Sequence, residues 1–514
     1  MHLSSARRDP RRTAAVSATI LLAFLALLAF AARAGAAETI YWDNYSGDPD
    51  NVAFANIDGS GGGVLNLGAA SIASPEGMAY DTVTNRMFVA NETGSGQILA
   101  INLDGSGAAP FVAPGALIDE PEGVAVDPIS RTIYWVNTEG AGSISWAKLD
   151  GSVGGTLNVA GATFGSPCCR LAVDPAGGRI YWVNTGPTPN VLSYANLDNT
   201  GGGDLSVVGS TVEPGGEGLA LDSTTGRIYF TGGDKIGFAN LNGSGGGDVS
   251  TAGAIIDEPY GIALDPSLGR LYTGNYGKGE ARDGAIGVLS LAGGGGGITP
   301  LTAPVDGPQD PVIIKSPVGT GAPSITRNPA KRAELTCSTG SWGADYPGSF
   351  VYQAPRSLAH QWTRNGAPIP GATAAVFTAT APGAYACTVT ATNHVGAAAQ
   401  GSAALKVKAS KVKLSTKKKA KADPGDLVTF KVRAVNQGDV QSKKARVCVK
   451  LPKAAKDDLR KPKCKKLGKL SGRVKKTATI KVKVKRGADE GVDKLTFQVK
   501  GTPGKAAKSR IVVD

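Results

Sequence analysis

Apolar and polar positions repeat along the first three fifths of the chain with a period of 43 to 48 residues. The clearest copy of the repeated phrase is DPAGGRIYWVN at Asp174–Asn184, where an apolar strand pattern follows a Gly-rich turn. Four further copies begin at Asp81, Asp127, Asp222 and Asp265. A period of this size is typical of repeat architectures, and four short strands in each unit predict a β-propeller.

One repeat divides into four predicted strands. Leu171–Asp174 is short and apolar, as expected of a strand near a crowded central axis, and Arg179–Asn184 follows it. Val191–Leu197 alternates between apolar and polar residues, which indicates a third strand. The Gly-rich segment Asp198–Gly203 is interpreted as a turn, because glycine supplies the positive φ of tight hairpins. Asp204–Val208 is then the predicted fourth strand.

The two ends of the repeat region complement each other. Ile40–Asn44 is a sixth copy without its first half, and Pro311–Lys315 has the pattern of a first strand without a second. We therefore expect both ends to complete one shared blade, which closes a six-bladed ring and removes two open sheet edges.

The aromatic pairs of the phrase carry a family resemblance. Tyr41-Trp42, Tyr134-Trp135 and Tyr181-Trp182, together with the Pro-Glu-Gly lead-ins at Pro75–Gly77 and Pro121–Gly123, resemble the YWTD propeller repeats of the low-density-lipoprotein receptor family. The resemblance covers about half of the chain and implies a six-bladed propeller. It implies no receptor function, because propellers host many unrelated activities.

The chain departs from that family at the last position of the motif. The family has an aspartate there, whereas this chain has asparagine in five copies, at Asn44, Asn91, Asn137, Asn184 and Asn275. An amide keeps the hydrogen-bond geometry of a carboxylate but not its charge. The Asp and Arg residues that recur in nearly every copy, such as Asp174 with Arg179, are interpreted as turn or inter-blade ties rather than catalytic groups.

Positions that break the repeat are the candidate functional residues. Five residues before each anchor, at the start of the predicted inner strand, stand Glu76, Glu122, Cys169, Glu217, Tyr260 and Asp310. In a closed ring these side chains line one mouth of the central channel. Four converging carboxylates, Glu76, Glu122, Glu217 and Asp310, could bind a hard cation such as Ca²⁺ or Mg²⁺. The alternative is that Pro-Glu-Gly is this repeat's turn sequence.

Cys168 and Cys169 replace the Pro-Glu of the other copies, and the repeat region contains no third cysteine. A vicinal disulfide, pairing between molecules, and two free thiols are the alternatives. A strained bond at a channel mouth would be a candidate redox or ligand-contact feature.

The histidines limit the enzymatic hypotheses. The chain has three, His2, His360 and His394, and none lies in the repeat region, which excludes a histidine-based mechanism on the ring. A metal-dependent hydrolase or lyase that uses Glu76, Glu122 or Glu217 stays open.

The segment 316–409 has the pattern of a second domain. Cys337 and Cys387 lie 50 residues apart with Trp362 between them, and Tyr385 stands two residues before the second cysteine. This pattern resembles immunoglobulin-like domains of bacterial secreted proteins. The resemblance implies a Cys337–Cys387 bridge across two sheets with Trp362 packed on it.

The segment 410–514 resembles the β-sandwich modules of bacterial surface proteins. Apolar and polar residues alternate in Thr479–Lys485, which predicts a strand with two different faces. Ile480, Val482 and Val484 should point inward, and Lys481, Lys483 and Lys485 should point outward. We expect Cys448 and Cys464 to pair and to close a Lys-rich loop.

Charge is distributed unevenly between these regions. From Glu38 to Ile314 there are 10 Lys and Arg against 30 Asp and Glu, whereas Lys411–Asp514 has 32 against 9. Nucleic acid is not expected as the partner, because the basic region lacks interleaved aromatic residues for stacking. An anionic envelope polymer or surface, docking on the acidic propeller, and a solvated face that maintains solubility are the alternatives.

Residues 1–37 have the pattern of an export signal. Four arginines between Arg7 and Arg12 precede an apolar run at 14–32, and small residues at 34–37 offer a cleavage site before Glu38. A retained membrane anchor is the alternative. The six cysteines that follow are an even number, as expected where disulfides form.

The sequence therefore predicts an all-β protein: a signal peptide at 1–37, a six-bladed propeller at 38–315, an immunoglobulin-like domain at 316–409 and a Lys-rich β-sandwich module at 410–514. The leading hypothesis is a secreted or cell-wall-associated, non-enzymatic binding protein. Its propeller would bind a protein or glycan ligand, and its basic module would attach it to an anionic envelope polymer. The rival hypothesis is a metal-dependent propeller hydrolase or lyase.

Overall fold

The structure is a computed structural model in which nearly all regular elements are strands. It describes residues 38–45, 49–92, 96–165, 170–185, 190–277, 284–301, 303–343 and 357–514, and the backbone of 167–169. The predicted export signal lies outside these residues. No helix in these ranges is long and apolar enough to cross a membrane. The chain forms two compact units: the first runs to Val318 and includes Thr392–Ala398, and the second contains the remaining described residues.

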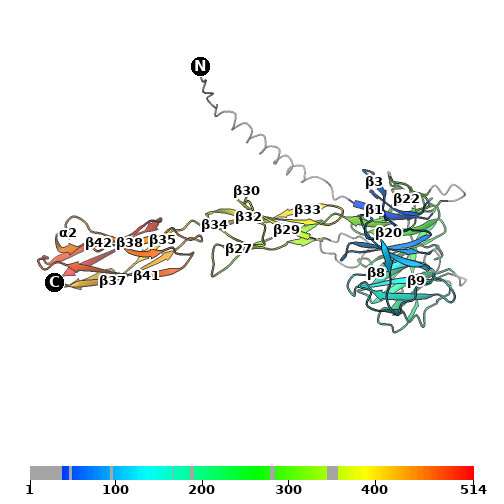
Figure 1. Ribbon diagram of the computed structural model, residues 1–514, viewed down its shortest axis with the longest axis horizontal. Helices are drawn as coiled ribbons and strands as arrows, with labels where there is room; N and C mark the ends of the chain where they lie inside the picture. The colour runs from blue at the N-terminus through cyan, green and yellow to red at the C-terminus, as the bar shows by residue number, and fades with distance from the viewer. Residues whose placement is uncertain are drawn as a thin grey trace, which may run out of the picture. The chain divides into compact units, whose positions relative to one another are not determined.

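The first unit is built from six four-stranded antiparallel sheets, as predicted (Figure 1). Each sheet contributes one inner strand: β4 (Pro75–Asp81), β8 (Pro121–Asp127), β12 (Pro167–Asp174), β16 (Leu219–Asp222), β20 (Pro259–Asp265) and β24 (Val312–Lys315). The second strands carry the aromatic pairs: β1 (Glu38–Asn44), β5 (Arg86–Asn91), β9 (Thr132–Asn137), β13 (Arg179–Asn184), β17 (Arg227–Gly232) and β21 (Arg270–Asn275).

The two outer positions of each sheet follow in chain order. The third strands are β2 (Asn51–Asn56), β6 (Gln97–Asn102), β10 (Ser143–Lys148), β14 (Val191–Asn196), β18 (Lys235–Asn240) and β22 (Ala285–Ser290). The outermost strands are β3 (Gly62–Val64), β7 (Ala109–Phe111), β11 (Gly154–Thr156), β15 (Gly202–Asp204), β19 (Gly246–Asp248) and β23 (Gly296–Ile298).

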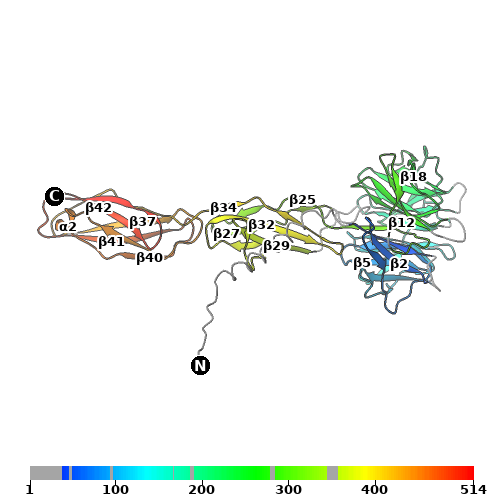
Figure 2. The same ribbon diagram turned by 90° about the horizontal axis from the view of Figure 1, so that it is seen from above.

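The ring closes through the first and last strands of the repeat region. β1 pairs antiparallel with β24, with Glu38 opposite Lys315 and Tyr41 opposite Val312. The inner strands contact one another in order, and β24 contacts both β20 and β4. Figure 2 shows the propeller with strands of four different blades labelled, β2, β5, β12 and β18. The prediction that both ends complete one blade is therefore confirmed, and the fold is a closed six-bladed propeller.

The predicted outermost strand was wrong in position. It was expected at Asp204–Val208, whereas β15 begins at Gly202 and pairs with Tyr194 and Ala195 of β14. A Cβ atom on Gly202 would lie 2.0 Å from the carbonyl oxygen of Tyr194. Gly202 and Gly203, which were interpreted as part of a turn, are thus strand residues. At Gly202 the neighbouring backbone approaches too closely for a side chain.

The aromatic pairs point to opposite faces of each blade and bury them between neighbours. Trp182 packs with Tyr134 of the preceding blade, whereas Tyr181 packs with Phe230 of the following one. Trp42, Trp135 and Trp182 are 0 % exposed. Each such side chain stabilises the inter-blade contact by roughly 2–3 kcal/mol through removal of apolar surface from water.

The recurring Asp and Asn side chains hold turns. The Asp174 carboxylate accepts a hydrogen bond of 2.8 Å from the Gly177 N–H, and the other anchor aspartates accept equivalent bonds. The Asn184 amide donates to the Thr163 carbonyl (3.0 Å) and to Ser193 Oγ (2.9 Å) while its oxygen accepts from Trp182 Nε1. A carboxylate could not donate to a carbonyl, which explains why asparagine replaces aspartate here.

The second unit begins with short sheets around one disulfide. Its strands are β25 (Gly319–Gly321), β26 (Ile325–Arg327), β27 (Glu334–Cys337), β28 (Ser341–Trp342), β29 (Ser357–Arg364), β30 (Ala367–Pro368), β31 (Val376–Thr378), β32 (Gly383–Thr392), β33 (Ala397–Gly401) and β34 (Leu405–Val407), of which Thr392–Ala398 belongs to the first unit. The predicted Cys337–Cys387 disulfide is present, and Trp362 is fully buried. The Tyr385 hydroxyl donates to the Ala381 carbonyl at 2.7 Å.

Two five-stranded sheets enclose a second core at the end of the chain. We name them by their long central strands. The β37 sheet contains β39 (Leu459–Arg460), β41 (Lys475–Val484), β37 (Leu427–Asn436), β35 (Val412–Ser415) and β43 (Gly504–Lys505). The β42 sheet contains β36 (Lys419–Ala422), β44 (Ala507–Val513), β42 (Gly491–Lys500), β38 (Ala445–Lys450) and β40 (Lys465–Gly468). The short helix α2 (Ala455–Asp458) precedes β39.

The alternating pattern of this region is realised as predicted. Ile480, Val482 and Val484 are buried in the core, whereas Lys481 and Lys483 are exposed. Phe430 and Phe497 meet between the two sheets with ring centroids 5.2 Å apart. The predicted Cys448–Cys464 disulfide is present. The lysines therefore cover the outer faces of two packed sheets.

Replacement of Asn184 tests the role assigned to the motif asparagine. We expect Asn184→Asp to lower the free energy of unfolding by about 3 kcal/mol, because a carboxylate would face the Thr163 carbonyl in a buried site. The loss should grow as pH rises, because only the protonated acid can donate a hydrogen bond. Urea denaturation at several pH values measures it. Asn242→Asp is the control, since aspartate stands at that turn position in other blades, and an equal loss in both variants would contradict the assignment.

Candidate functional site

The six inner strands enclose a channel, and most of them are irregular at the same point. The pairing register of β4, β8, β12 and β20 shifts between Pro75 and Gly77, Pro121 and Val124, Cys168 and Leu171, and Pro259 and Gly261. A β-bulge bends its strand and redirects the next side chains. In these four strands, the position five residues before the anchor, which the sequence singled out, and the position after it therefore lie at the bulge.

Small residues make room in the channel for one large side chain. Four residues before their anchors, four blades have Gly77, Gly123, Gly218 and Gly261, whereas the blade of β12 has Arg170. A Cβ atom on Gly261 would lie 2.8 Å from Asp310 Oδ1, and one on Gly77 would lie 3.2 Å from Asp310 Oδ2. The glycines thus allow Asp310 to approach the axis, where Arg170 meets it.

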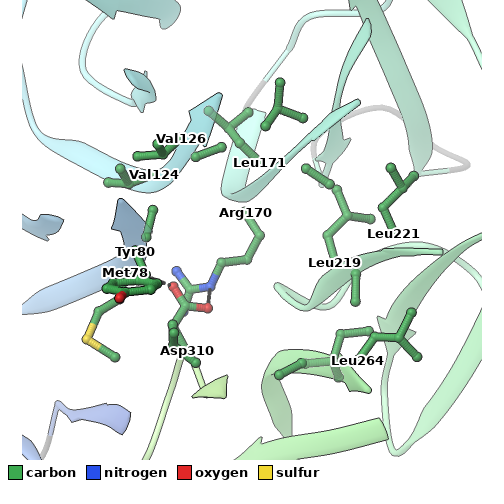
Figure 3. A pocket seen from close by; sticks show the side chains of 18 of the residues that line it. Met78, Tyr80, Val124, Val126, Arg170, Leu171, Leu219, Leu221, Leu264 and Asp310 are labelled. Carbon is green, nitrogen blue, oxygen red and sulfur yellow. Dashed lines mark hydrogen bonds and ion pairs between the residues drawn. The ribbon is translucent and has the colours of Figure 1, made fainter. Parts of the chain in front are cut away.

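Arg170 and Asp310 form a buried ion pair inside the ring (Figure 3). The guanidinium also donates to the Glu76 carbonyl and, at 3.2 Å, to Gln309 Oε1. Asp310 Oδ2 accepts a hydrogen bond of 2.9 Å from the Met78 N–H. Arg170 is 5 % exposed and Asp310 8 %. These contacts link blades on opposite sides of the channel and block its passage.

Asp43 lies near this pair and also breaks the repeat. Other second strands have an apolar or small residue at its position, such as Val136 and Val183. Its side chain is 0 % exposed, and neither carboxyl oxygen has a hydrogen-bond partner among the described residues. Burial, followed by the charge of Asp310, raises the pKa of Asp43 well above its usual value. Burial also raises the pKa of Asp310, whereas the charge of Arg170 and the hydrogen bond from the Met78 N–H oppose that shift.

Three predicted carboxyl groups lie on the exposed side of the plug formed by Arg170 and Asp310. Burial raises the pKa of Glu76 to about 9, and the charges of Glu217, Glu122 and Asp43 add to the shift while Arg170 opposes it. Burial likewise raises the pKa of Glu217 to about 7, with Glu122 and Asp310 contributing in the same direction. The mouth is thus a partly dehydrated group of acids that share protons near neutral pH.

Tyrosines adjoin these acids. Tyr260, predicted at the mouth, stacks on the buried Tyr276 with ring centroids 4.7 Å apart, and Tyr45 lies 6.0 Å from Tyr276. Burial, and then the charge of Glu217, raises the pKa of Tyr260 to about 12. Tyr260 keeps partial exposure. The mouth therefore offers aromatic surface beside carboxyl groups, a combination that suits saccharides and organic cations.

Beyond the plug the channel is apolar. A cavity of about 130 Å³ is lined by side chains that point inward from all six inner strands, among them Met78, Val124, Leu171, Leu219 and Leu264 (Figure 3). Arg170 and Asp310 supply its charged lining. The plug therefore separates a polar mouth from an apolar interior.

The predicted metal site is arranged differently from expectation. Asp310 is paired with Arg170 and so neutralised, and no three His, Cys, Asp or Glu side chains in the described residues are placed to hold one metal ion. Ca²⁺ or Mg²⁺ at the mouth thus stays a prediction from the sequence alone. Cys168 and Cys169 lie on β12, and their side chains fall outside the described residues.

Sequence reasoning missed Arg170, Asp43 and Gln309. The first two carried a signal, since each replaces a glycine or an apolar residue that the other copies share. Only the closed ring shows that these two deviations, from blades far apart in the sequence, lie near each other.

Comparison with known proteins assigns no family to this chain. No protein-family model matches this chain, and no curated protein matches it. Solved structures resemble it over the propeller: a chain of a nidogen–laminin complex has 16% identity and a TM-score of 0.41, covering 54% of this chain and 98% of its own length. A candidate TolB of Agrobacterium tumefaciens has 11% identity and a TM-score of 0.37, with coverages of 55% and 100%. A gluconolactonase of Xanthomonas campestris has 16% identity and a TM-score of 0.36, covering 58% of this chain and 89% of its own length. These propellers include enzymes and non-enzymes.

A double-mutant cycle tests the buried ion pair. We expect Arg170→Met to lower the free energy of unfolding by about 3–5 kcal/mol, because it leaves the Asp310 carboxylate buried without its partner. The double variant Arg170→Met/Asp310→Asn removes both charges and should recover most of that loss. Chemical denaturation of the single and double variants measures the coupling. Additive losses would show that the two side chains do not act as a pair.

The raised pKa values predict the pH dependence of stability. A carboxyl group whose pKa is higher in the folded state than in the unfolded state stabilises fully below about pH 4.5, and this contribution is lost as pH rises through the folded value. The loss should run from about pH 4.5 to about pH 7 for Glu217 and to about pH 9 for Glu76. Glu217→Gln mimics the neutral acid and should therefore be more stable than the parent at pH 8, by on the order of 1–3 kcal/mol. Thermal unfolding from pH 5 to 9 measures this difference, which should vanish near pH 5. The exposed control Glu139→Gln should show no such trend.

Proposed function

We propose that this protein is an extracellular, non-enzymatic binding protein. Its propeller mouth holds a protein or glycan ligand, and its basic C-terminal module attaches the protein to an anionic polymer of the cell envelope. The immunoglobulin-like segment that precedes this module acts as a spacer. Two disulfides support an extracellular setting, because such bonds persist in oxidising compartments.

The observation that carries the proposal is the blocked channel. The Arg170–Asp310 pair blocks the axis, while Glu76, Glu217 and the partly exposed Tyr260 remain on its open side. A ligand that enters the mouth therefore rests on a fixed floor. Aromatic and hydrogen-bonding groups around a concave site are typical of ligand binding by pre-formed surfaces.

The rival enzymatic hypothesis has less support from the described residues. A metal-dependent hydrolase or lyase needs several ligands around one ion, and the described side chains provide no such set. Burial raises the pKa of Glu76 and Glu217, which favours their neutral forms, and Asp310 pairs with Arg170. These features favour a structural and binding role. Binding thus explains the arrangement with fewer additional requirements.

Co-sedimentation with purified cell envelopes tests both halves of the proposal. We expect the chain from Glu38 to Asp514 to bind at low salt and to lose most binding at about 0.5 M salt, where the Debye length falls to a few ångströms. A chain ending at Lys408 should lack this salt-sensitive part. The salt-resistant remainder should fall about tenfold in Tyr260→Ala, because an aromatic anchor is lost.

Tyr194→Ala provides the matched control. Tyr194 lies on the third strand β14, away from the mouth, and its ring stacks against the guanidinium of Arg179. Circular dichroism confirms that each variant is folded. If both chains bind alike at low salt, the basic module is not the anchor. If Tyr260→Ala retains all salt-resistant binding, the mouth is not the ligand site.

A further inference from the structure

A groove crosses the outer face of the β42 sheet. Its volume is about 580 Å³, and five cationic side chains line it together with Thr496, Gln498 and Ser509. The cations are Lys418, Lys450, Lys494, Lys508 and Arg510. The groove lining contains no carboxylate. Such a concave, single-sign surface focuses the field and attracts counter-charged ligands.

The strand register places these cations directly beside one another. Arg510 on β44 stands opposite Lys494 on β42 and beside Lys419 on β36. The three side chains form one row across three strands, with adjacent strands roughly 4.8 Å apart. In the next row Thr496 lies between Lys508 and Lys450. Like charges directly opposite each other destabilise a sheet, so this row carries a cost in the free protein.

The central pair of the β37 sheet avoids that cost. Each outward cation of β37 and β41 stands opposite an uncharged residue: Lys431 opposite Thr479, Arg433 opposite Thr477 and Lys481 opposite Thr429. Like pairs occur only at the two edges of the sheet, where Arg460 stands opposite Lys483 and Lys413 stands beside Lys505. Dispersed lysines suffice for solubility. The β42 sheet therefore has a charge arrangement that solubility does not require.

We propose that the groove of the β42 sheet binds a linear phosphodiester polymer, whose anionic groups occupy the positions between the opposed cations. The inference rests on the proposed envelope attachment and names its ligand class. Four of the five cations are lysines, which bind phosphate groups as point charges on flexible stems and do not require one fixed orientation of the ligand. A single extended chain fits a concave groove, whereas a flat bilayer does not. Thr496 and Gln498 add neutral hydrogen-bond partners for sugar or glycerol hydroxyls.

Two variants of equal charge separate the groove from general attraction. Lys494→Gln/Lys508→Gln/Arg510→Gln removes two lysines and one arginine from the groove. Lys431→Gln/Lys481→Gln/Arg433→Gln removes the same residue types from the β37 sheet. Binding of fluorescently labelled linear polyphosphate by the chain from Glu38 to Asp514 is measured by anisotropy over a salt series. We expect the groove variant to bind about tenfold or more weakly near 0.1 M salt, and to show a shallower salt dependence, because fewer counterions are released.

The control variant should lose less than about threefold, through long-range attraction alone. Equal losses in both variants would overturn the proposal, because net charge would then explain binding. Thermal unfolding verifies folding: the groove variant should melt at the same temperature as the parent or higher, because the opposed like charges are gone. A lower melting temperature in the groove variant alone would contradict the claim that the opposed cations destabilise the β42 sheet.

Two further probes fix the ligand class. Polygalacturonate, a carboxylate polymer, should bind more weakly than polyphosphate, and tighter binding would overturn the choice of phosphate. Vesicles containing phosphatidylglycerol should lose binding to the same extent in both variants. Selective loss of vesicle binding in the groove variant, with polyphosphate binding unchanged, would make the groove a membrane site.

The two proposals can fail separately. Selective polyphosphate binding without envelope co-sedimentation would leave the groove intact and reject the anchor. Envelope binding that persists in the groove variant would keep the anchor and reject the groove as its ligand site.

Discussion

The antiparallel pairing of β1 with β24 is the constraint on which the propeller depends. It joins the first strand of the repeat region to the last one, and it is reinforced where Lys315 pairs with Glu38 at 3.2 Å and with Asp265 of the neighbouring blade. Without this closure two sheet edges would remain open. With it, six inner strands surround one channel, and residues more than one hundred positions apart become neighbours. Arg170, Asp310 and Asp43 acquire their surroundings only through this closure.

Burial then decides the chemistry of the channel. A carboxylate and a guanidinium taken out of water are tolerated as a pair, whereas an unpaired acid is tolerated only when neutral. Asp310 is paired with Arg170, whereas burial raises the pKa of Asp43 and so favours its neutral form. Gly77 and Gly261 are part of the same arrangement, because a Cβ atom on either of them would crowd the Asp310 carboxylate. The channel is thus plugged by a charge pair whose cost is offset by hydrogen bonds from several blades, and the mouth is left as a shallow site.

The basic module shows how register can distinguish two uses of the same residue type. Lysines on the β37 sheet alternate with threonines across the central strand pair, which separates the charges. Lysines and arginine on the β42 sheet face each other around a groove. Both faces are rich in basic residues. The pairing of strands determines which face concentrates charge and which only keeps the protein in solution.

Repetition in the sequence was enough to predict the blades, their number and the closing pair, because the period of hydrophobic positions and the offset of the two ends are local properties of the chain. The same holds for the two disulfides and for the outward lysines of β41. The outermost strand β15 was predicted in the wrong position. Gly202 is required there because the backbone of β14 lies close to it, and a local sequence pattern does not show this contact. The site was predicted in part: Glu76, Glu217 and Tyr260 lie at the mouth, but Asp310 pairs with Arg170 instead of joining a carboxylate ring. Arg170 and Asp43 were visible in the sequence only as departures from the repeat. Their meaning depends on contacts across the channel and on burial, which no single repeat contains and which only the tertiary structure decides.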